Sequence, residues 1–203
     1  MKIAEVEFNF DEDYTKLNSL PEDPKDSVSF GARTENADCF IMIYPIPQEQ
    51  AMPFDNCKPV IDGIHNCLGN DQGLIEVENG NTKSGLPYIQ SIVKTLDQEH
   101  HGVSYCLTLH IQYSNSVLLI QGFFNETGTT GIRDTQVFLA LREKGTVTLT
   151  ENGAEGWAKD PYDENYKAGV LKNLGEDKDF DQFFPAHPLS ECRRLLNYIL
   201  ENN

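Results

Sequence analysis

The feature that most constrains the fold is an alternation of apolar and polar residues between positions 103 and 113. Every second residue from Val103 to Tyr113 is aliphatic or aromatic, while Ser104, Thr108 and His110 lie between them. Neighbouring side chains of a β-strand point to opposite faces, so one face of this strand is expected in the core and the other in water. That pattern is typical of an antiparallel sheet covered on one side.

Turn signals around this strand predict that residues 73–124 are nearly all strand. Two segments precede it, "GLIEVENGN" and "LPYIQSIVKTL", and a turn at Asn79-Gly80 is expected to join them. The segment "VLLIQGFF" follows it after a turn at Ser114-Asn115. Nearer the N-terminus, the patterns predict a strand at 2–9, a loop or a short helical turn at 11–26, and a hairpin of strands at 27–35 and 38–47.

Three segments have the apolar spacing of a helix. The first covers 57–68 and the second 128–144, and both are expected to pack on the sheet. The third follows Pro188, a residue that is tolerated in the first turn of a helix. Their apolar positions are Val60, Ile61, Ile64, Cys67 and Leu68; Ile132, Val137, Ala140 and Leu141; and Leu189, Cys192, Leu195, Leu196, Ile199 and Leu200.

This order of elements predicts an α+β fold, in which a twisted antiparallel sheet carries helices 57–68 and 128–144. Residues 1–150 are expected to form this domain. Residues 151–203 are expected to be an acidic, aromatic-containing extension that ends in an amphipathic helix. Its aromatic residues are too apolar for a free tail, so it is expected to pack on the same domain. Docking of the extension on a partner is the alternative.

Charge restricts the partners. The chain has 32 acidic and 16 basic residues and a net charge of −16. Nucleic-acid binding requires clustered Lys and Arg, so no nucleic acid is expected as a partner, and an anionic membrane surface is disfavoured. A protein partner stays open.

The lack of a targeting signal and the pattern of cysteines predict a cytoplasmic protein. The N-terminus lacks the apolar stretch of a secretory signal, and no run approaches the roughly 18 apolar residues of a membrane span. Membrane insertion is therefore not expected. The cysteines are odd in number and widely spaced, which predicts reduced thiols, most of them buried. They are Cys39, Cys57, Cys67, Cys106 and Cys192.

Arg133 and Asp134 are the first candidates for a site, at the mouth of the second helix. Their side chains are expected to point roughly 100° apart, so they cannot easily address one substrate atom. Asp134 lies in the first turn, where a carboxylate meets free N–H groups. Arg133 is expected to bridge to the sheet edge or to the extension, and a structural role is favoured for both residues.

Cys106 and His110 share the polar face of the alternating strand. Four positions separate them by about 13 Å, which excludes a direct nucleophile–base pair in a regular strand. A base from elsewhere, such as His65 or His187, stays open. His100 and His101 are adjacent and lack the further ligands of a zinc site, so they are interpreted as turn residues.

Residues 177–188 begin like a calcium loop, with Asp177, Asp179 and Asp181 at its first, third and fifth positions. Gln182 replaces the glycine needed at the sixth position, and Pro188 replaces the glutamate needed at the twelfth. Calcium binding is therefore disfavoured. The sequence assigns no catalytic, cofactor-binding or metal residues, and no cofactor is expected.

The order of elements over residues 27–145 resembles the PsbP-like fold. The resemblance covers the hairpin 27–47, the helix "CKPVIDGIHNCL", the strands with "YCLTLHIQYSNSVLLIQGFF", and the helix "GIRDTQVFLALREKG". The PsbP-like group includes an extrinsic photosystem subunit, a Ran-binding nuclear import factor and bacterial DcrB-like proteins. The resemblance implies a mostly non-catalytic binding or assembly role, and it carries over no catalytic residues.

Taken together, these features predict a cytoplasmic, non-catalytic protein of the adaptor or chaperone kind, from a bacterium. The alternative is a small hydrolase or transferase whose site is assembled from distant residues such as Cys106, His110 and Arg133. A third reading, based on charge alone, is an acidic immunity-type protein that blocks a basic surface. A binder should show a broad exposed apolar patch, and an enzyme should show a deep pocket where polar groups converge.

Overall fold

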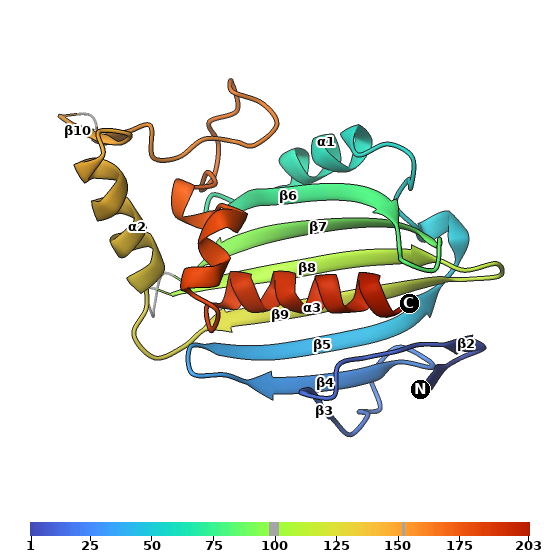
Figure 1. Cartoon of the computed structure of the whole chain (residues 1–203). Coiled ribbons are helices and arrows are strands. Elements are labelled where there is room, and N and C mark those ends of the chain that lie inside the picture. Colours follow the sequence, from blue (N-terminus) through green and yellow to red (C-terminus); the bar gives the residue numbers. More distant parts are fainter. Residues whose placement is uncertain (98–101, 152) are drawn as a thin grey trace.

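The computed structural model of the chain describes residues 1–97, 102–151 and 153–203. In this part of the chain the main sheet has seven antiparallel strands in the order β3-β4-β5-β9-β8-β7-β6 (Figure 1). The α+β class is therefore confirmed. The strands are β3 (Thr15–Lys16), β4 (Val28–Arg33), β5 (Ala37–Ile46), β6 (Gln72–Asn81), β7 (Pro87–Leu96), β8 (Val103–Gln112) and β9 (Val117–Glu126).

Helix α3 (Pro188–Asn202) lies across one face of this sheet, which we call the inner face (Figure 1). Pro188 begins the helix, as the sequence predicts. Leu195 and Ile199 are completely buried there, in one cluster with Leu107 of β8 and Ile120 of β9. The apolar alternation of β8 is confirmed, because its residues from Tyr105 to Ile111 share this cluster at every second position. The prediction that its other face lies in water was wrong for His110, which is 4% exposed and lies under residue 52. The last helix of the chain is thus part of the main core.

The opposite, outer face carries α1 (Lys58–Cys67), which begins and ends close to the predicted bounds. Val60 of α1 packs with Val77 and Ile89 of the sheet. The segment that precedes α1, including the 3₁₀ turn η1 (Gln48–Gln50), covers a second apolar cluster around Val117. The prediction that Cys67 faces the core was wrong, because its side chain is exposed at the end of the helix.

Helix α2 (Ile132–Glu143) stands at one end of the sheet instead of lying on a face (Figure 1). It begins four residues later than predicted, because Gly131 has the left-handed conformation at φ 72°. Its buried residues are Arg133 and Val137, while Ile132 and Ala140 are exposed. The helix packs on the 3₁₀ turn η2 (Leu174–Glu176). The prediction that α2 packs on the sheet through Ile132 and Ala140 was therefore wrong.

Three predicted details of the strands also differ. The segment 11–26, predicted as a loop or a short helical turn, contains β3, which pairs with β4. The N-terminal strand is a small hairpin of β1 (Lys2–Ile3) and β2 (Val6–Glu7), because Ala4 turns the chain at φ 48°. This turn lets Ile3 and Phe8 both enter the core. The predicted turn at Asn79-Gly80 was wrong, because β6 continues to Asn81 and Gly80 lies opposite Tyr88. The chain reverses later, around Gly85 at φ 89°.

After a short hairpin of β10 (Thr148–Thr150) and β11 (Gly153–Glu155), residues of the segment 162–178 contact the edge strand β6. The amide of Val170 donates to the Gln72 carbonyl at 2.8 Å. A side chain at Gly73 would place its Cβ 1.6 Å from the Val170 carbonyl oxygen, so only glycine fits there. The extension covers a strand edge that would otherwise be open for pairing. Among the described residues, no helix is long and apolar enough to cross a membrane.

Candidate functional site

Arg133 is 1% exposed and binds residues of the C-terminal segment. Its Nε donates to the Gly175 carbonyl at 2.6 Å, and its Nη1 donates to Ser190 Oγ at 2.8 Å. Its Nη2 donates to Asp181 Oδ1 at 2.9 Å and to the Asp177 carbonyl at 3.1 Å. The expectation that Arg133 bridges to the extension is confirmed. These bonds occupy three of its nitrogen atoms in structural contacts.

Asp134 has a separate partner, as its neighbouring position predicts. Its Oδ2 accepts a hydrogen bond from Asn173 Nδ2 at 2.9 Å. Burial and the nearby carboxylate of Glu176 raise the pKa of Asp134. Arg133 and Asp134 therefore both fix the same turn, η2, to the start of α2, and neither faces a shared substrate position.

Further buried charges surround this turn, and the sequence did not indicate them. Lys94 of β7 donates to Glu176 Oε2 at 2.8 Å, and both side chains are almost fully buried. Arg193 of α3 pairs with Glu76 of β6 at 3.0 Å and with Asp181 at 3.1 Å. The one available signal was that Lys94 shares the strand face of Gln90 and Ile92. Buried ion pairs of this kind fix geometry more than they add stability.

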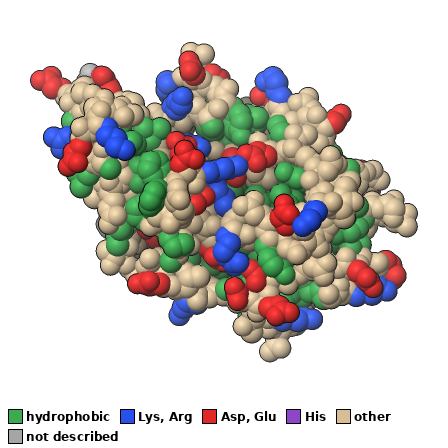
Figure 2. Space-filling model, viewed as in Figure 1, with side chains coloured by type: hydrophobic (Ala, Val, Ile, Leu, Met, Phe, Trp, Pro, Cys, Tyr) green, Lys and Arg blue, Asp and Glu red, His purple; other side chains and the backbone are tan. Residues whose placement is uncertain are grey.

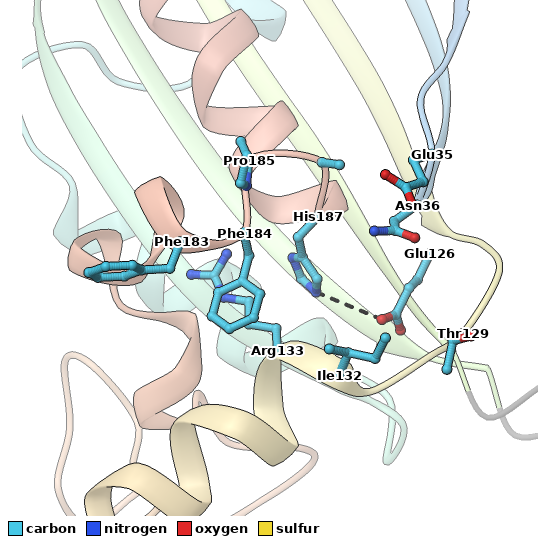
Figure 3. A pocket seen from close by; sticks show the side chains of 11 residues that line it. Glu35, Asn36, Glu126, Thr129, Ile132, Arg133, Phe183, Phe184, Pro185 and His187 are labelled. Carbon is cyan, nitrogen blue, oxygen red and sulfur yellow. Dashed lines mark ion pairs between the residues drawn. The ribbon is translucent and has the colours of Figure 1, made fainter.

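A pocket of about 220 Å³ opens beside this network, between the start of α2 and residues 183–187 (Figure 3). One wall is polar and carries Glu35, Asn36 and Glu126. The other wall is apolar and includes Phe183 of the 3₁₀ segment η3 (Lys178–Phe183) together with Phe184. His187 lies between the two walls (Figure 3). Sequence reasoning singled out only His187 and Arg133 among these residues.

Glu126 and His187 face each other in this pocket. The Glu126 side chain is 5% exposed, and its Oε1 accepts the Gly131 amide proton at 2.9 Å. Burial raises the pKa of Glu126. Burial together with Arg133 and Arg193 lowers the pKa of His187 to about 3, so its ring is neutral near pH 7. The ring Nδ1 accepts the Leu189 amide proton, which leaves the ring proton on Nε2, 4.0 Å from Glu126.

A second candidate surface lies on the outer face of the sheet. Strand register places Phe40, Phe123, Cys106 and Val93 side by side on neighbouring strands. Leu17 extends this line over Gly31, which is the partner of Phe40. We call these five residues the outer row. The rings of Phe40 and Phe123 lie 6.4 Å apart, and Phe123 is 41% exposed.

Polar residues flank most of the outer row. On one side the register places Gln121, Thr108 and Ser91 beside Met42, and on the other side it places Asn125 and Ser104 beside Asp38. The row is therefore an apolar line with polar borders. Such a surface is typical of protein interaction sites.

The structure does not bring Cys106, His110 and Arg133 together. Cys106 lies on the outer face, and Arg133 binds residues that pack against the inner face. Burial raises the pKa of the Cys106 thiol, so the thiol form is favoured. His110 Nδ1 accepts the Met52 amide proton at 3.0 Å. These contacts give His110 a structural role in holding residue 52 on the sheet.

His110 is expected to make the fold sensitive to acid. Burial lowers its pKa from 6.5 to about 4. Between pH 4 and pH 6.5 the unfolded chain binds more protons than the folded one. The stability that buried, neutral His110 contributes is therefore complete above pH 6.5 and is lost as the pH falls to 4. The difference in unfolding free energy between wild type and His110→Gln should shrink by on the order of 3 kcal/mol over this range. Urea unfolding at pH 7 and pH 4 measures it, and a constant difference would contradict the assignment.

The remaining candidates are dispersed. His65 of α1 lies 2.9 Å from Asp160 and stacks on Tyr166, so it holds the extension against α1. Asp177 pairs with Lys172, and Asp181 pairs with Arg133 and Arg193. His100 and His101 lie outside the described residues. Within the described ranges, no group of three His, Cys, Asp or Glu side chains is arranged to hold a metal ion.

Comparison with known proteins adds little to these observations. No family model matches the sequence, and no curated protein matches it. One similar solved structure is the crystal structure of PA94, a protein of unknown function from Pseudomonas aeruginosa. It is 13% identical, with a TM-score of 0.38, and the match covers 68% of this chain and 97% of that one.

Proposed function

We propose that the protein is a non-catalytic, cytoplasmic protein-binding module of the adaptor or chaperone kind. The outer row is the observation that supports this function most strongly. It crosses the strands from β4 to β7, a span of about 19 Å at roughly 4.8 Å per strand. Leu17 and Phe123 are exposed and Phe40 is partly exposed, so covering the row removes apolar area from water and favours association.

We also propose that the fold belongs to the PsbP-like group. The order of hairpin, helix, four antiparallel strands and helix between β4 and α2 supports this assignment. Fold likeness alone says little about function, so the binding role depends on the surface and not on the family.

The outer row is expected to be required for partner capture. Phe123→Thr keeps a β-branched residue in the strand and removes the exposed ring, so unfolding free energy should change by no more than about 1 kcal/mol. Capture of a specific protein from native cytosol by full-length protein should fall about tenfold or more. Quantitative mass spectrometry of the captured proteins is the measurement.

Leu139→Gln provides the matched control. Leu139 is 49% exposed on α2, away from the outer row, and glutamine preserves helix propensity. This variant should capture the same partner as wild type. If Phe123→Thr captured the partner as well as Leu139→Gln does, the outer row would not be the binding surface.

A further inference from the structure

Among the described residues, no cation in the walls of the pocket of Figure 3 balances its negative charge. Glu126 and Glu35 both line it. Arg133 is the one cationic residue among the described lining residues, and it is already bound to Asp181 and to backbone carbonyls. His187 lies 4.0 Å from Glu126, beyond direct hydrogen-bond distance. A buried carboxylate without a cationic partner is costly, so a cation in the pocket would lower its free energy.

Backbone contacts hold Glu126 in this position. The amides of Gly131 and Val103 donate to its carboxylate, and the first of these fixes the loop that leads into α2. A purely structural role as a cap for this loop would explain those contacts. A glutamine could accept the same amide protons without a buried charge, however. Replacement of Glu126 by glutamine therefore distinguishes a structural hydrogen-bond acceptor from a site that needs the negative charge.

The wall opposite the carboxylates suits an alkyl chain. Phe183 is 67% exposed and Ile132 is 39% exposed, so both offer apolar surface at the mouth. Phe184 is less exposed than Phe183, and the centroid of its ring lies 6.0 Å from Cζ of Arg133. An apolar wall beside carboxylates matches a flexible aliphatic stem that ends in a positive charge.

The size of the pocket limits what it can hold. Its volume of about 220 Å³ is below the roughly 300–1,000 Å³ of sites for drug-sized ligands and cofactors. A single long side chain is within this limit. The cavity is therefore suited to one protruding group.

We propose that this pocket binds an alkylammonium or guanidinium group, such as the end of a Lys or Arg side chain, between Glu126 and the wall of Phe183 and Phe184. Glu126 accepts hydrogen bonds from the cation, and Glu35 adds a second carboxylate at the rim. The assignment to a protein side chain rests on the proposed protein-binding function, whereas the preference for a cation does not.

Binding of short peptides to the full-length protein tests this site. The probes are acetylated, amidated Gly-Lys-Gly and Gly-Arg-Gly, with Gly-norleucine-Gly as the uncharged analogue and agmatine as a free cation. Affinities on the order of millimolar are expected, because the buried group has only about ten heavy atoms. Two-dimensional ¹H–¹⁵N NMR at low salt follows the amide signals of Gly131 and Ile132, which adjoin Glu126.

We expect the Lys and Arg peptides to shift these signals and to bind at least tenfold more tightly than the norleucine peptide. Glu126→Gln should weaken the Lys peptide about tenfold or more, because charge-assisted hydrogen bonds are lost. The matched control is Glu143→Gln, an equal charge change at an exposed position on α2, which should leave binding unchanged. Unchanged NMR spectra away from the pocket would show that Glu126→Gln is folded.

Three results would overturn the proposal: equal binding of the norleucine peptide, unaltered affinity of Glu126→Gln, or no shift with any cation. Binding of agmatine without binding of the peptides would support a cation site but assign it to a small molecule. The outer row is tested separately through Phe123. A negative result for the pocket would therefore not contradict the proposed protein-binding function. A negative result for Phe123→Thr would likewise not contradict the cation site.

Discussion

A chain that ends at Ala186, just before α3, is expected to remain unfolded. The five apolar residues of α3 that are buried against the sheet each contribute about 1.5–3 kcal/mol. Their combined loss is on the order of 10 kcal/mol, similar to the entire stability of a typical domain. Near-UV circular dichroism and NMR dispersion would detect the missing tertiary structure. The five residues are Leu189, Cys192, Leu195, Leu196 and Ile199.

Point variants separate the loss of core packing from other effects of truncation. Leu195 is completely buried, and Leu195→Ala should lower the unfolding free energy by about 2–5 kcal/mol. Leu139→Ala, at an exposed position of α2, should change it by no more than about 0.5 kcal/mol. A truncated chain with a cooperative thermal transition and dispersed NMR signals would show that α3 is dispensable for folding.

Replacement of Arg133 by methionine is expected to lower the unfolding free energy by about 3–5 kcal/mol. Methionine fills a similar volume but provides no hydrogen-bond donor. The Gly175 and Asp177 carbonyls would lose their bonds from the guanidinium, and Asp181 would keep only Arg193 as a cation. Urea unfolding followed by far-UV circular dichroism measures the loss.

Arg142→Met is the matched control, because Arg142 is exposed in the last turn of the same helix. Its effect should stay within about 0.5 kcal/mol. Arg133→Lys should also be strongly destabilised, since one ammonium cannot replace the planar set of donors on the guanidinium. A loss below 1 kcal/mol for Arg133→Met would mean that these buried contacts have little energetic weight.

The periodicity of apolar residues predicted the strands of the sheet better than it predicted which helix packs on them. The alternation in β8 correctly divided Tyr105 and Leu107 from Thr108 and His110, because strand faces depend only on parity. The same reasoning failed for α2, whose apolar residues Ile132 and Ala140 are exposed. Which helix covers a sheet depends on distant contacts, and here α3 occupies that place.

The candidate sites were even harder to predict, because their residues are far apart in the sequence. Lys94 and Glu176 are 82 residues apart, and nothing in the sequence indicates that both are buried. Glu126 and His187 meet only because the strand end and the extension converge at the start of α2. The outer row needs the register of five strands, which a single sequence does not give. Arg133 was the exception, because its position beside Asp134 at a helix start suggested a structural bridge.

The position of α3 in the core has a consequence for synthesis on the ribosome. All strands of the main sheet are translated before α3, so the inner face of a nascent sheet lacks the cover of this helix. At about 5–20 residues per second, the 15 residues of α3 take on the order of 1–3 s to add. During this interval inner-face residues such as Leu107 and Ile120, which cluster with α3 in the folded protein, lack its cover and are accessible to chaperones and to neighbouring nascent chains. Folding is therefore completed late, and the yield of native protein depends on how quickly α3 emerges and docks.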